Sequence, residues 1–482
     1  MIYNLELITK DRESNLLFLY GDDVSDRTLP LSRRELELVK SRRAEKRDFF
    51  MVFDRLPYRL YFLSYDSEKP APECQEGLRR RAMAVLKRLE EDHVTDLAVT
   101  GGGILVDEMA AMVEGLTLAD YSFDRYRSKE SYHLATLAID NRLMRPEALE
   151  ASKHLWNRIF WCREWVNLPV QDFNAASFAD ELQSIAADLE GVKCTVMDKK
   201  QIESLRMGGL LAVNRGSVDE PRFVVLEYTP SNQNTPSNPI VLVGKGIMYD
   251  TGGLNIKPND YMQEMKSDMA GAATMASVLF AAADNKLPVH IVALLPMTDN
   301  RPGFNAYAAD DILTMYDGTT VEVANTDAEG RLILADAIAY AAKNYHPSLI
   351  IDAATLTGAA VRAISTFGIA AMQQHASDPF NLLKIVGDQV FERLVEFPMW
   401  SEYDELIKSE IADLRNSSNT PQAGTITAGK FLAHFAGEVP YIHLDIAGVA
   451  YFTKPQHCYR VGASAYGMRL LYAFLQMQDM MK

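Results

Sequence analysis

The second half of the chain alternates short apolar segments of strand length with longer segments of helical character. The apolar segments have no polar face, so strands formed from them would be buried on both sides. That pattern is typical of a largely parallel sheet covered by helices on both faces, and ligands of such sheets bind beside the carboxyl ends of the strands. Predicted strands lie at residues 223–228, 240–243, 289–295, 320–324, 348–352 and 441–446, and predicted helices at 261–283 and 333–343.

A smaller α/β pattern precedes this region. Residues 58–64 and 96–100 are predicted strands, and residues 78–89 between them repeat apolar side chains at helical spacing. A second helix is predicted over residues 107–115. The glycine triplet 101–103 is interpreted as a plain loop, because a lone triplet is weak support for a phosphate site.

These two patterns indicate an α/β protein of two domains. A length of 482 residues exceeds the roughly 150 residues of an average domain. We predict a smaller N-terminal α/β domain over residues 1–144 and a long linking helix over 145–168. The larger C-terminal domain, residues 169–482, would carry the mostly parallel, helix-covered sheet.

The composition is that of a packed globular chain, with 48% hydrophobic and 24% charged residues. The net charge of −16 repels phosphate backbones, so nucleic acid is not an expected partner. Arginine clusters at residues 33–34, 42–43 and 79–81 are interpreted as solvated helix faces.

We expect a cytoplasmic protein with no membrane partner. No apolar run approaches the roughly 18 residues that span a bilayer, and residues 1–14 lack the apolar core of a signal peptide. The cysteines are far apart and form no CxxC motif, which is not the pattern of a disulfide scaffold. They are Cys74, Cys162, Cys194 and Cys458.

Several common catalytic motifs are absent from the sequence. None of the nine histidines forms HExxH, and Ser464 misses the GxSxG pattern by one residue. Residues 244–246, Gly-Lys-Gly, lack the remainder of a P-loop, and no GxGxxG opens a helix after a strand. Histidine-based zinc peptidases, serine hydrolases, P-loop NTPases and dinucleotide enzymes therefore all lose support.

Acidic residues instead gather where predicted strands end. Asp250 follows the strand at 240–243, Asp268 opens the next helix, and Asp327 and Glu329 follow a later strand. In an extended chain, residues two apart point the same way, so the last two repel unless a cation lies between them. Two divalent cations would balance four buried carboxylates. From spacing alone, helix caps and surface salt bridges explain these acids equally well.

The sequence around these acids resembles the leucyl aminopeptidase (cytosol aminopeptidase) family of two-metal exopeptidases. Residues 325–332, Asn-Thr-Asp-Ala-Glu-Gly-Arg-Leu, match the signature octapeptide of that family in full. The resemblance covers residues 170–482 strongly and the first 150 residues loosely, mainly around 114–126. Four further motifs match in order and spacing, at residues 243–258, 265–268, 354–359 and 443–448.

The resemblance implies a catalytic metallopeptidase domain with two divalent ions per subunit, zinc or manganese being expected and magnesium left open. Lys245 would bind only as a neutral amine, a form that burial favours. The resemblance also implies a bicarbonate held by Arg331. The implied metal ligands are Lys245, Asp250, Asp268, Asp327 and Glu329. The implied catalytic residues are Lys257 and Arg331, and the implied substrate-pocket residues are Met265, Thr355 and Ala447.

The activity implied is release of N-terminal residues, leucine and other apolar ones, from peptides with a free N-terminus by a homohexamer. Two departures leave loop shape and substrate preference open: Ala270 replaces a common glycine, and residues 308–310 differ from the Arg-Pro-Gly of many members. The alternatives are a DNA-binding or regulatory protein and a non-catalytic hexamer of the same fold. The net charge disfavours the first, and the intact ligand set disfavours the second.

Overall fold

Two sheets organise the chain, one in each of two compact units. Unit 1 comprises Met1–Phe160 and Phe452–Gly462, and unit 2 comprises Trp161–Tyr451 and Ala463–Lys482. The division falls inside the predicted linking helix, and the predicted boundaries at 144 and 168 stay predictions. The computed structural model describes residues 4–8, 14–21, 24–25, 28–231, 238–418 and 420–478. Most of the segment considered for a signal peptide, residues 1–3 and 9–13, lies outside the described residues.

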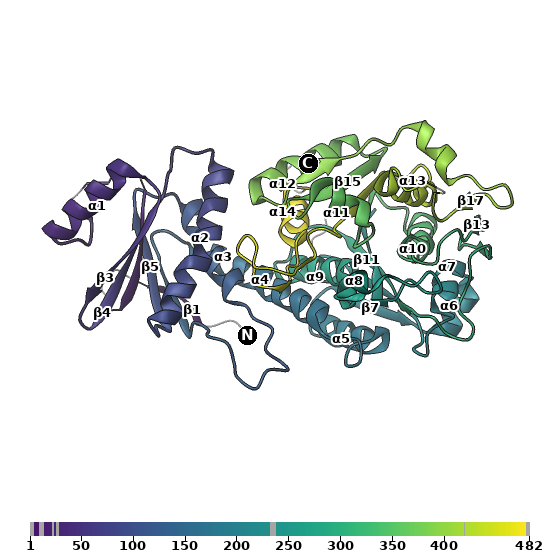
Figure 1. Ribbon diagram of the computed structural model, residues 1–482, viewed down its shortest axis with the longest axis horizontal. Helices are drawn as coiled ribbons and strands as arrows, with labels where there is room; N and C mark the ends of the chain where they lie inside the picture. The colour runs from purple at the N-terminus through teal and green to yellow at the C-terminus, as the bar shows by residue number, and fades with distance from the viewer. Residues whose placement is uncertain are drawn as a thin grey trace. The chain divides into compact units, whose positions relative to one another are not determined.

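The sheet of unit 1 has the order β1-β6-β5-β2-β4-β3, and every neighbouring pair is parallel except β3 with β4 (Figure 1). The strand predicted at 58–64 is confirmed as β4. The strands are β1 Asn4–Ile8, β2 Asn15–Tyr20, β3 Phe49–Arg55, β4 Tyr58–Ser64, β5 Asp96–Gly102 and β6 Thr136–Asp140.

Helices cover both sides of this sheet. On one side, Val39 of α1 packs in a small core with Phe18 and Phe62. On the other side α2 and α3 pack together, and Gly115 allows this approach because a Cβ there would lie 2.6 Å from the Cα of Arg79. The helices are α1 Arg33–Glu45, α2 Ala71–Glu91, α3 Val106–Asp120 and α4 Pro146–Asn167.

The interpretation of the glycine triplet 101–103 as a plain loop is wrong for its first two residues, because Gly101 and Gly102 end β5 and only Gly103 follows the strand. A carboxylate lies at the amino end of the next helix, α3. Glu108 Oε2 accepts hydrogen bonds from the backbone N–H of Leu105 and the hydroxyl of Tyr65, both at 2.7 Å. Cys74 Sγ lies 3.4 Å from Glu108 Oε1. The acid therefore occupies the position at the helix N-terminus where a phosphate would otherwise bind.

The main sheet of unit 2 has the order β16-β15-β18-β14-β9-β11-β8-β7, with β10 added beside β11. Its central strands β18, β14, β9 and β11 are parallel, and antiparallel pairs flank them on both sides. The predicted fold class, with a mostly parallel sheet, is thereby confirmed. The strands are β7 Val192–Met197, β8 Arg222–Tyr228, β9 Ile240–Gly244, β10 Gly246–Asp250, β11 Ile291–Asn300, β14 Leu349–Ala354, β15 Ile369–Gln374, β16 Leu394–Glu396 and β18 Tyr441–Asp445.

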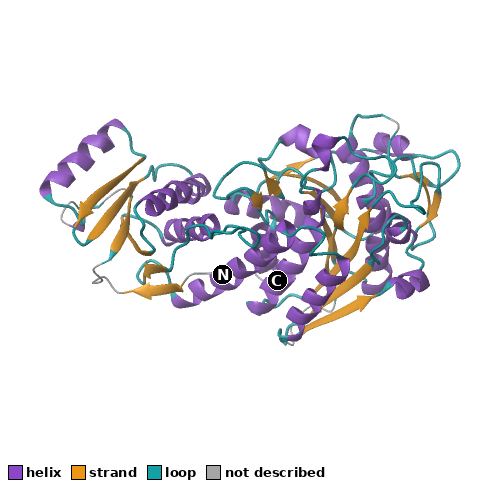
Figure 2. Cartoon of the chain, turned by 60° about the horizontal axis from the view of Figure 1, so that its bottom comes forward, coloured by secondary structure: helices purple, strands orange, loops and turns teal. Residues whose placement is uncertain are grey.

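Helices lie on both faces of this sheet (Figure 2). A three-stranded sheet, β12 Ile312–Thr314, β13 Thr320–Glu322 and β17 Leu414–Arg415, and the short pair β19 Tyr451–Phe452 and β20 Gly462–Ala463 complete the strands. No helix among the described residues has the length and apolar character needed to cross a bilayer. The helices are α5 Ala175–Ala187, α6 Lys199–Leu205, α7 Gly208–Asn214, α8 Asn259–Met262, η2 Met265–Met269, α9 Ala270–Asp284, α10 Gly330–Tyr345, α11 Gly358–Ile364, α12 Ser377–Val390, η3 Ser401–Ile407, α13 Gly424–Ala436 and α14 Met468–Gln478.

The single helix predicted over residues 261–283 is wrong. The segment forms α8, the 3-10 helix η2 and α9, because Glu264 has a left-handed backbone with φ of 68° that interrupts the helix. The tight 3-10 turn carries Asp268 just before α9 begins. The interruption therefore presents a carboxylate that a regular helix would have placed elsewhere.

Residues 452–462 belong to unit 1 although they lie near the end of the chain. Arg460 Nε donates a hydrogen bond to the carbonyl of Ala119 in α3 at 2.9 Å. His457 Nδ1 lies 3.5 Å from Glu76 Oε1 in α2. The chain consequently passes between the units at 160/161, 451/452 and 462/463.

Candidate functional site

The implied metal ligands meet at the carboxyl edge of the parallel strands in unit 2. Lys245 directly follows β9, Asp250 ends β10, and Asp268 lies in η2. Asp327 and Glu329 lie between β13 and α10. Five residues that span 85 positions of sequence are thus brought to the edge where ligands of such sheets bind.

One group of charges gathers around Lys257. Its Nζ atom lies 2.7 Å from Asp250 Oδ2 and 2.6 Å from Asp327 Oδ1. Carboxylate oxygens of Asp250, Asp327 and Glu329 lie within 4.8 Å of one another. Three acids at this separation repel strongly unless positive charge lies among them.

A second, more buried group gathers around Lys245. Its Nζ atom lies 2.8 Å from Asp268 Oδ1 and 2.9 Å from Glu329 Oε1, and donates to the carbonyl of Thr355 at 2.9 Å. Gly330 makes room for this side chain, because a Cβ at that position would lie 2.4 Å from Lys245 Cε. The first residue of α10 therefore allows the lysine to reach both carboxylates.

Burial is the largest influence on the pKa values of Asp268 and Asp327. It raises the pKa of Asp268 to about 8 and the pKa of Asp327 to about 6, in each case against the opposite influence of the adjacent lysine. Burial lowers the pKa of Lys245, but Asp268 and Glu329 together outweigh it, and the pKa is raised above its usual value. Burial favours the neutral amine, as the sequence argument stated, but without a metal ion the neighbouring carboxylates favour the protonated lysine.

Asp327 and Glu329 do not approach each other through extended backbone, as the sequence argument assumed. Residues 326–327 form a turn, and Glu329 has helical φ and ψ of −74° and −39° at the start of α10. The expected proximity is present, but a turn followed by a helix produces it. The alternation of side chains along a β-strand was therefore the wrong physical reason for the proximity of Asp327 and Glu329.

The donor set fits divalent cations. Asp268 Oδ2 and Glu329 Oε2 are buried and have no hydrogen-bond partner among the described residues. A buried carboxylate oxygen without a partner is costly unless a cation or a proton satisfies it. Zinc, manganese and magnesium all accept a ligand set of carboxylates together with one amine.

A hydrogen-bonded network around Thr326 holds the carboxylate loop. Thr326 Oγ1 donates to the carbonyl of Gly252 at 2.6 Å, and its backbone N–H donates to Asn255 Oδ1 at 2.8 Å. Asn300 Nδ2 donates both to the Thr326 carbonyl at 3.0 Å and to Asp250 Oδ1 at 2.9 Å. Two acid-bearing segments are therefore locked to each other.

Arg331 lies beside this loop and is 7% exposed. Its Nη1 atom donates to the carbonyl of Asn416 at 2.8 Å, while its Nε atom is buried without a hydrogen-bond partner among the described residues. Burial lowers the pKa of Arg331 to about 10. Sequence reasoning missed Asn300 and Asn416, which lie outside every matched motif and carry no periodic signal.

Of the implied pocket residues, Thr355 contacts one of the acids, and the roles of all three stay predictions. Met265 begins η2, and Thr355 Oγ1 donates to Asp268 Oδ1 at 2.7 Å. The backbone N–H of Ala447 donates to Asp445 Oδ1 at 3.1 Å. Thr355 thus contacts an implied metal ligand directly, in addition to any contact with substrate.

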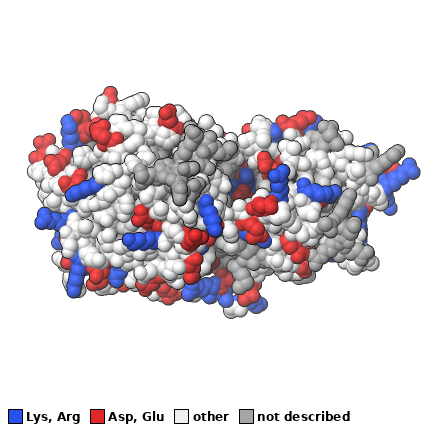
Figure 3. All heavy atoms as spheres, turned by 180° about the vertical axis from the view of Figure 1, so that it is seen from behind, with Lys and Arg blue, Asp and Glu red and all other residues white. Residues whose placement is uncertain are grey.

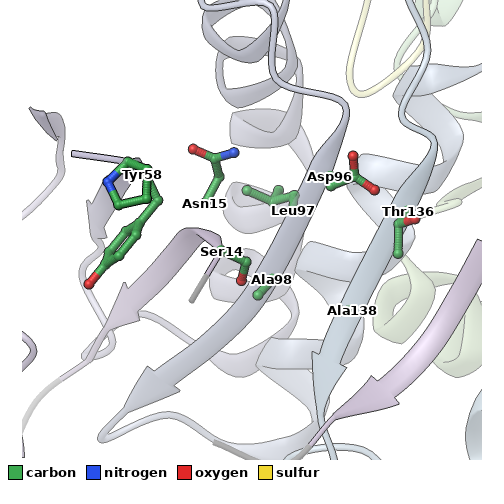
Figure 4. Close-up of a pocket in the computed structure, with 9 residues that line it drawn as sticks. Ser14, Asn15, Tyr58, Asp96, Leu97, Ala98, Thr136 and Ala138 are labelled. Carbon is green, nitrogen blue, oxygen red and sulfur yellow. The ribbon is translucent and has the colours of Figure 1, made fainter. Parts of the chain in front are cut away.

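A separate pocket of about 270 Å³ lies in unit 1 (Figure 4). It opens at the amino ends of β2, β5 and β6, opposite the edge where ligands of parallel sheets bind. Its one carboxylate, Asp96, accepts a hydrogen bond from Thr95 Oγ1. It therefore lacks the grouped acids and lysines of unit 2. Its lining residues are Ser14, Asn15, Pro57, Tyr58, Asp96, Leu97, Ala98, Thr136 and Ala138.

The fold and the site together define a two-unit α/β protein with a cluster of acids that could hold a metal ion. Residues 160–472 match the catalytic domain of the cytosol aminopeptidase family, and residues 69–130 match its N-terminal domain. The chain belongs to the cytosol aminopeptidase family and is an aminopeptidase, which confirms the resemblance seen in the sequence.

Similar proteins share this architecture over most of their length. Probable cytosol aminopeptidases of Syntrophotalea carbinolica and Chlorobaculum tepidum are 39% and 42% identical, with 83% of this chain and 82% and 83% of theirs covered. A tomato leucine aminopeptidase variant has a TM-score of 0.86 at 25% identity, covering 98% of this chain and 96% of that one. The bottromycin maturation enzyme BotP in complex with Mn has a TM-score of 0.81 at 28% identity, covering 96% and 99%.

Proposed function

We propose that this aminopeptidase is metal-dependent and removes N-terminal leucine and other apolar residues from peptides with the help of two divalent ions. The observation that carries the proposal is the clustering of Asp250, Asp327 and Glu329, whose oxygens lie within 4.8 Å of one another. A second set, Lys245 and Asp268, adjoins it through Glu329. These two sets offer places for two ions that share an acid.

The five ligands would hold zinc or manganese, and magnesium remains open. The Mn complex of the structurally similar BotP supports manganese as one of the ions. When bound, such ions lower the pKa of a coordinated water and polarise the scissile carbonyl. Lys245 would bind in its neutral form, so its proton must leave as the cation arrives.

The chain's own residues would then stabilise the reaction. Lys257, 14% exposed at its side chain, would donate to the oxyanion that forms at the scissile carbonyl. Arg331 would hold bicarbonate through its unsatisfied Nε atom, and this anion would accept a proton. Met265, Thr355 and Ala447 would line the pocket for the first side chain of the peptide.

We further propose a homohexamer that works in the cytoplasm on peptides with a free N-terminus. The family resemblance supports the hexamer, and the name of the related cytosol aminopeptidases supports the location. Free amine substrates would bind unprotonated, and an α-amine has a pKa of roughly 7.7–8.0. Activity should therefore rise into alkaline pH.

No observation favours the DNA-binding alternative. Members of the arginine clusters pair with acids: Arg33 lies 3.4 Å from Glu37, and Arg81 lies 3.1 Å from Asp48. The interpretation of residues 79–81 as a solvated face is wrong for Arg79, which is 7% exposed and pairs with Glu114. Acidic and basic side chains are interspersed over the face in Figure 3. Nor does any observation favour a non-catalytic hexamer, because every implied ligand and catalytic residue is present.

The test is hydrolysis of leucine p-nitroanilide at about pH 8–9 with added manganese, with and without a chelator. We expect turnover that the chelator abolishes and that Asp327→Ala eliminates. Glu220→Ala is the matched control, because Glu220 is an exposed acid whose partner is Arg222. Turnover that resists complete removal of metal, or that survives in Asp327→Ala, would contradict the proposal.

A further inference from the structure

The buried side chain of Asn416 contacts the loop that carries Asp327 and Glu329. Asn416 follows β17 and is 0% exposed. Its Oδ1 atom accepts from the backbone N–H groups of Ala324 and Asn325 at 2.8 and 3.2 Å. Its Nδ2 atom donates to the carbonyls of Asn325 and Ala328 at 2.7 and 3.3 Å. Two donors and two lone pairs are thereby all used.

The backbone of the same residue holds Arg331. The carbonyl of Asn416 accepts from Arg331 Nη1 at 2.8 Å, which is the hydrogen bond that the described residues give this guanidinium. One residue therefore contacts the acid-bearing loop through its side chain and the arginine through its main chain. Arg331 is otherwise buried with its Nε atom unsatisfied, so its orientation depends on this carbonyl.

The segment that carries Asn416 is anchored on its own. The backbone N–H of Asn416 donates to the carbonyl of Glu322 at 3.0 Å, as β17 runs parallel to β13. Arg415 Nη2 lies 2.8 Å from Glu322 Oε1, and Ser409 Oγ donates to the other oxygen of that acid. A change in the Asn416 side chain would therefore leave β17 in place but remove the hydrogen bonds between that side chain and the acid-bearing loop.

The acid-bearing loop is also held independently, through Thr326 by Gly252, Asn255 and Asn300. Asp327 would consequently keep its position without the Asn416 amide. The side-chain amide of Asn416 alone sets the spacing between that loop and the Asn416 carbonyl, which orients Arg331. A primary amide is needed there, because a carboxylate would set negative oxygens against the carbonyls of Asn325 and Ala328.

We propose that Asn416 is a positioning residue that orients Arg331 relative to the carboxylate loop. This inference rests on the proposed function, in which Arg331 serves the reaction. The near-isosteric change Asn416→Asp should lower kcat by about 10²-fold, the effect of a misplacement near 1 Å. KM should change by less than about threefold, since uniform substrate binding is not removed. Metal content should stay at the wild-type value.

The matched control is Asn214→Asp. Asn214 is 3% exposed, and its amide likewise donates to a backbone carbonyl, that of Asp219 at 2.7 Å. The same chemical change is therefore made in the same unit without contact to the carboxylate loop. If Asn416→Asp does not fold, Asn416→Ala removes the same hydrogen bonds without adding a charge, and the same kcat loss is expected.

A double variant separates positioning from a general structural defect. In an Arg331→Ala background, adding Asn416→Asp should change kcat by less than about twofold, because the group through which Asn416 acts is gone. Multiplicative losses in the double variant would overturn the inference. So would a kcat for Asn416→Asp within about twofold of the wild type.

A second readout does not need turnover. Phenylglyoxal labelling of Arg331, followed by peptide mass spectrometry, should run about fivefold faster in Asn416→Asp, because the arginine samples open orientations. Labelling in Asn214→Asp should match the wild type. If the wild type itself shows no turnover, the proposed function fails, and the labelling rates alone decide the inference. Equal labelling in all three proteins would overturn it.

Discussion

Both units place a buried glutamate at the amino end of a helix that follows a strand edge, but the two acids are treated differently. Glu108 of unit 1 accepts hydrogen bonds from Leu105 and Tyr65, and closes the end of α3. Glu329 of unit 2 shares Lys245 with another acid, and its Oε2 atom has no hydrogen-bond partner among the described residues. The first acid is satisfied within the fold, whereas the second keeps an unsatisfied oxygen, which a metal ion would satisfy in the function we propose.

The comparison teaches which buried carboxylates belong to function. A structural acid is satisfied by groups that fold with it, whereas an acid of a binding site retains unsatisfied oxygens. The position of the acid in the fold does not distinguish the two kinds, since both glutamates lie at a helix N-terminus, where the helix dipole stabilises an anion. What distinguishes them is whether every carboxylate oxygen has a hydrogen-bond or ion-pair partner within the protein.

The largest effect is expected at the unsatisfied acid. Glu329→Gln should lower kcat by about 10³-fold or more, because an amide is a poor metal ligand and two ions would share this acid. Unfolding of the metal-free variant should change little, because relief of repulsion among the acids offsets the lost ion pair with Lys245. Leucine p-nitroanilide turnover and urea unfolding measure the two quantities. Full activity with normal metal content would break the comparison.

The next effect is expected at the glycine that admits Lys245. Gly330→Ala places a Cβ 2.4 Å from Lys245 Cε, so the lysine must move. We expect a loss of about 10²-fold in kcat/KM together with a lower metal content. Gly77→Ala is the control, because a Cβ at that helical position meets nothing within 4 Å. Equal activity in the two variants would show that Lys245 is not required in its present place.

The third expected effect is a dependence of metal affinity on pH. Burial raises the pKa of Asp327 to about 6 and of Asp268 to about 8, so in the metal-free site Asp268 largely keeps its proton at neutral pH, whereas Asp327 holds one only in more acidic solution. A cation displaces them, and affinity should therefore rise with pH, by about tenfold per unit for each proton released. Titration calorimetry with Mn²⁺ between pH 6 and 9, in two buffers of different ionisation enthalpy, counts the protons. An affinity independent of pH would contradict this charge assignment.

The smallest effect is expected in unit 1. Glu108→Gln removes an acceptor from Leu105 or Tyr65 and should lower the free energy of unfolding by about 1–3 kcal/mol. Its kcat/KM should remain within about twofold of the wild type, because the acid is satisfied within the fold. Glu73→Gln, at an exposed acid of α2, is the control in the urea titrations. Loss of activity without loss of stability would reverse the roles assigned to the two units.

The sequence best predicts those elements that coincide with an uninterrupted apolar run. The buried strands at 223–228, 240–243 and 441–446 are found within one residue of their predicted ends, because uninterrupted apolar runs leave little choice of structure. The helix expected at 261–283 fails at Glu264, where a left-handed backbone gives no warning in hydropathy. β1, β2, β3 and α1 went unpredicted, although β2 is itself a nearly continuous apolar run that lies between β5 and β4.

The candidate site likewise has residues that the sequence predicts and residues that it does not. Its charged residues lie in a few short motifs, so sequence alone finds them. Asn300 and Asn416 act through backbone groups of segments far away in the chain, at Thr326 and Ala328, and neither periodicity nor spacing encodes such contacts. The supporting amides therefore become visible only when the loops are seen folded against each other.

The return of residues 452–462 to unit 1 makes that unit a product of two distant stretches of the gene. A fragment that stops at Phe160 would lack Arg460 and its bond to Ala119, and so would omit part of its own fold. A single protease cut within α4 would leave the halves tethered through the later crossings. Anyone exchanging this unit between relatives must transplant both peptides, and circular permutation offers the cleaner route to an isolated one.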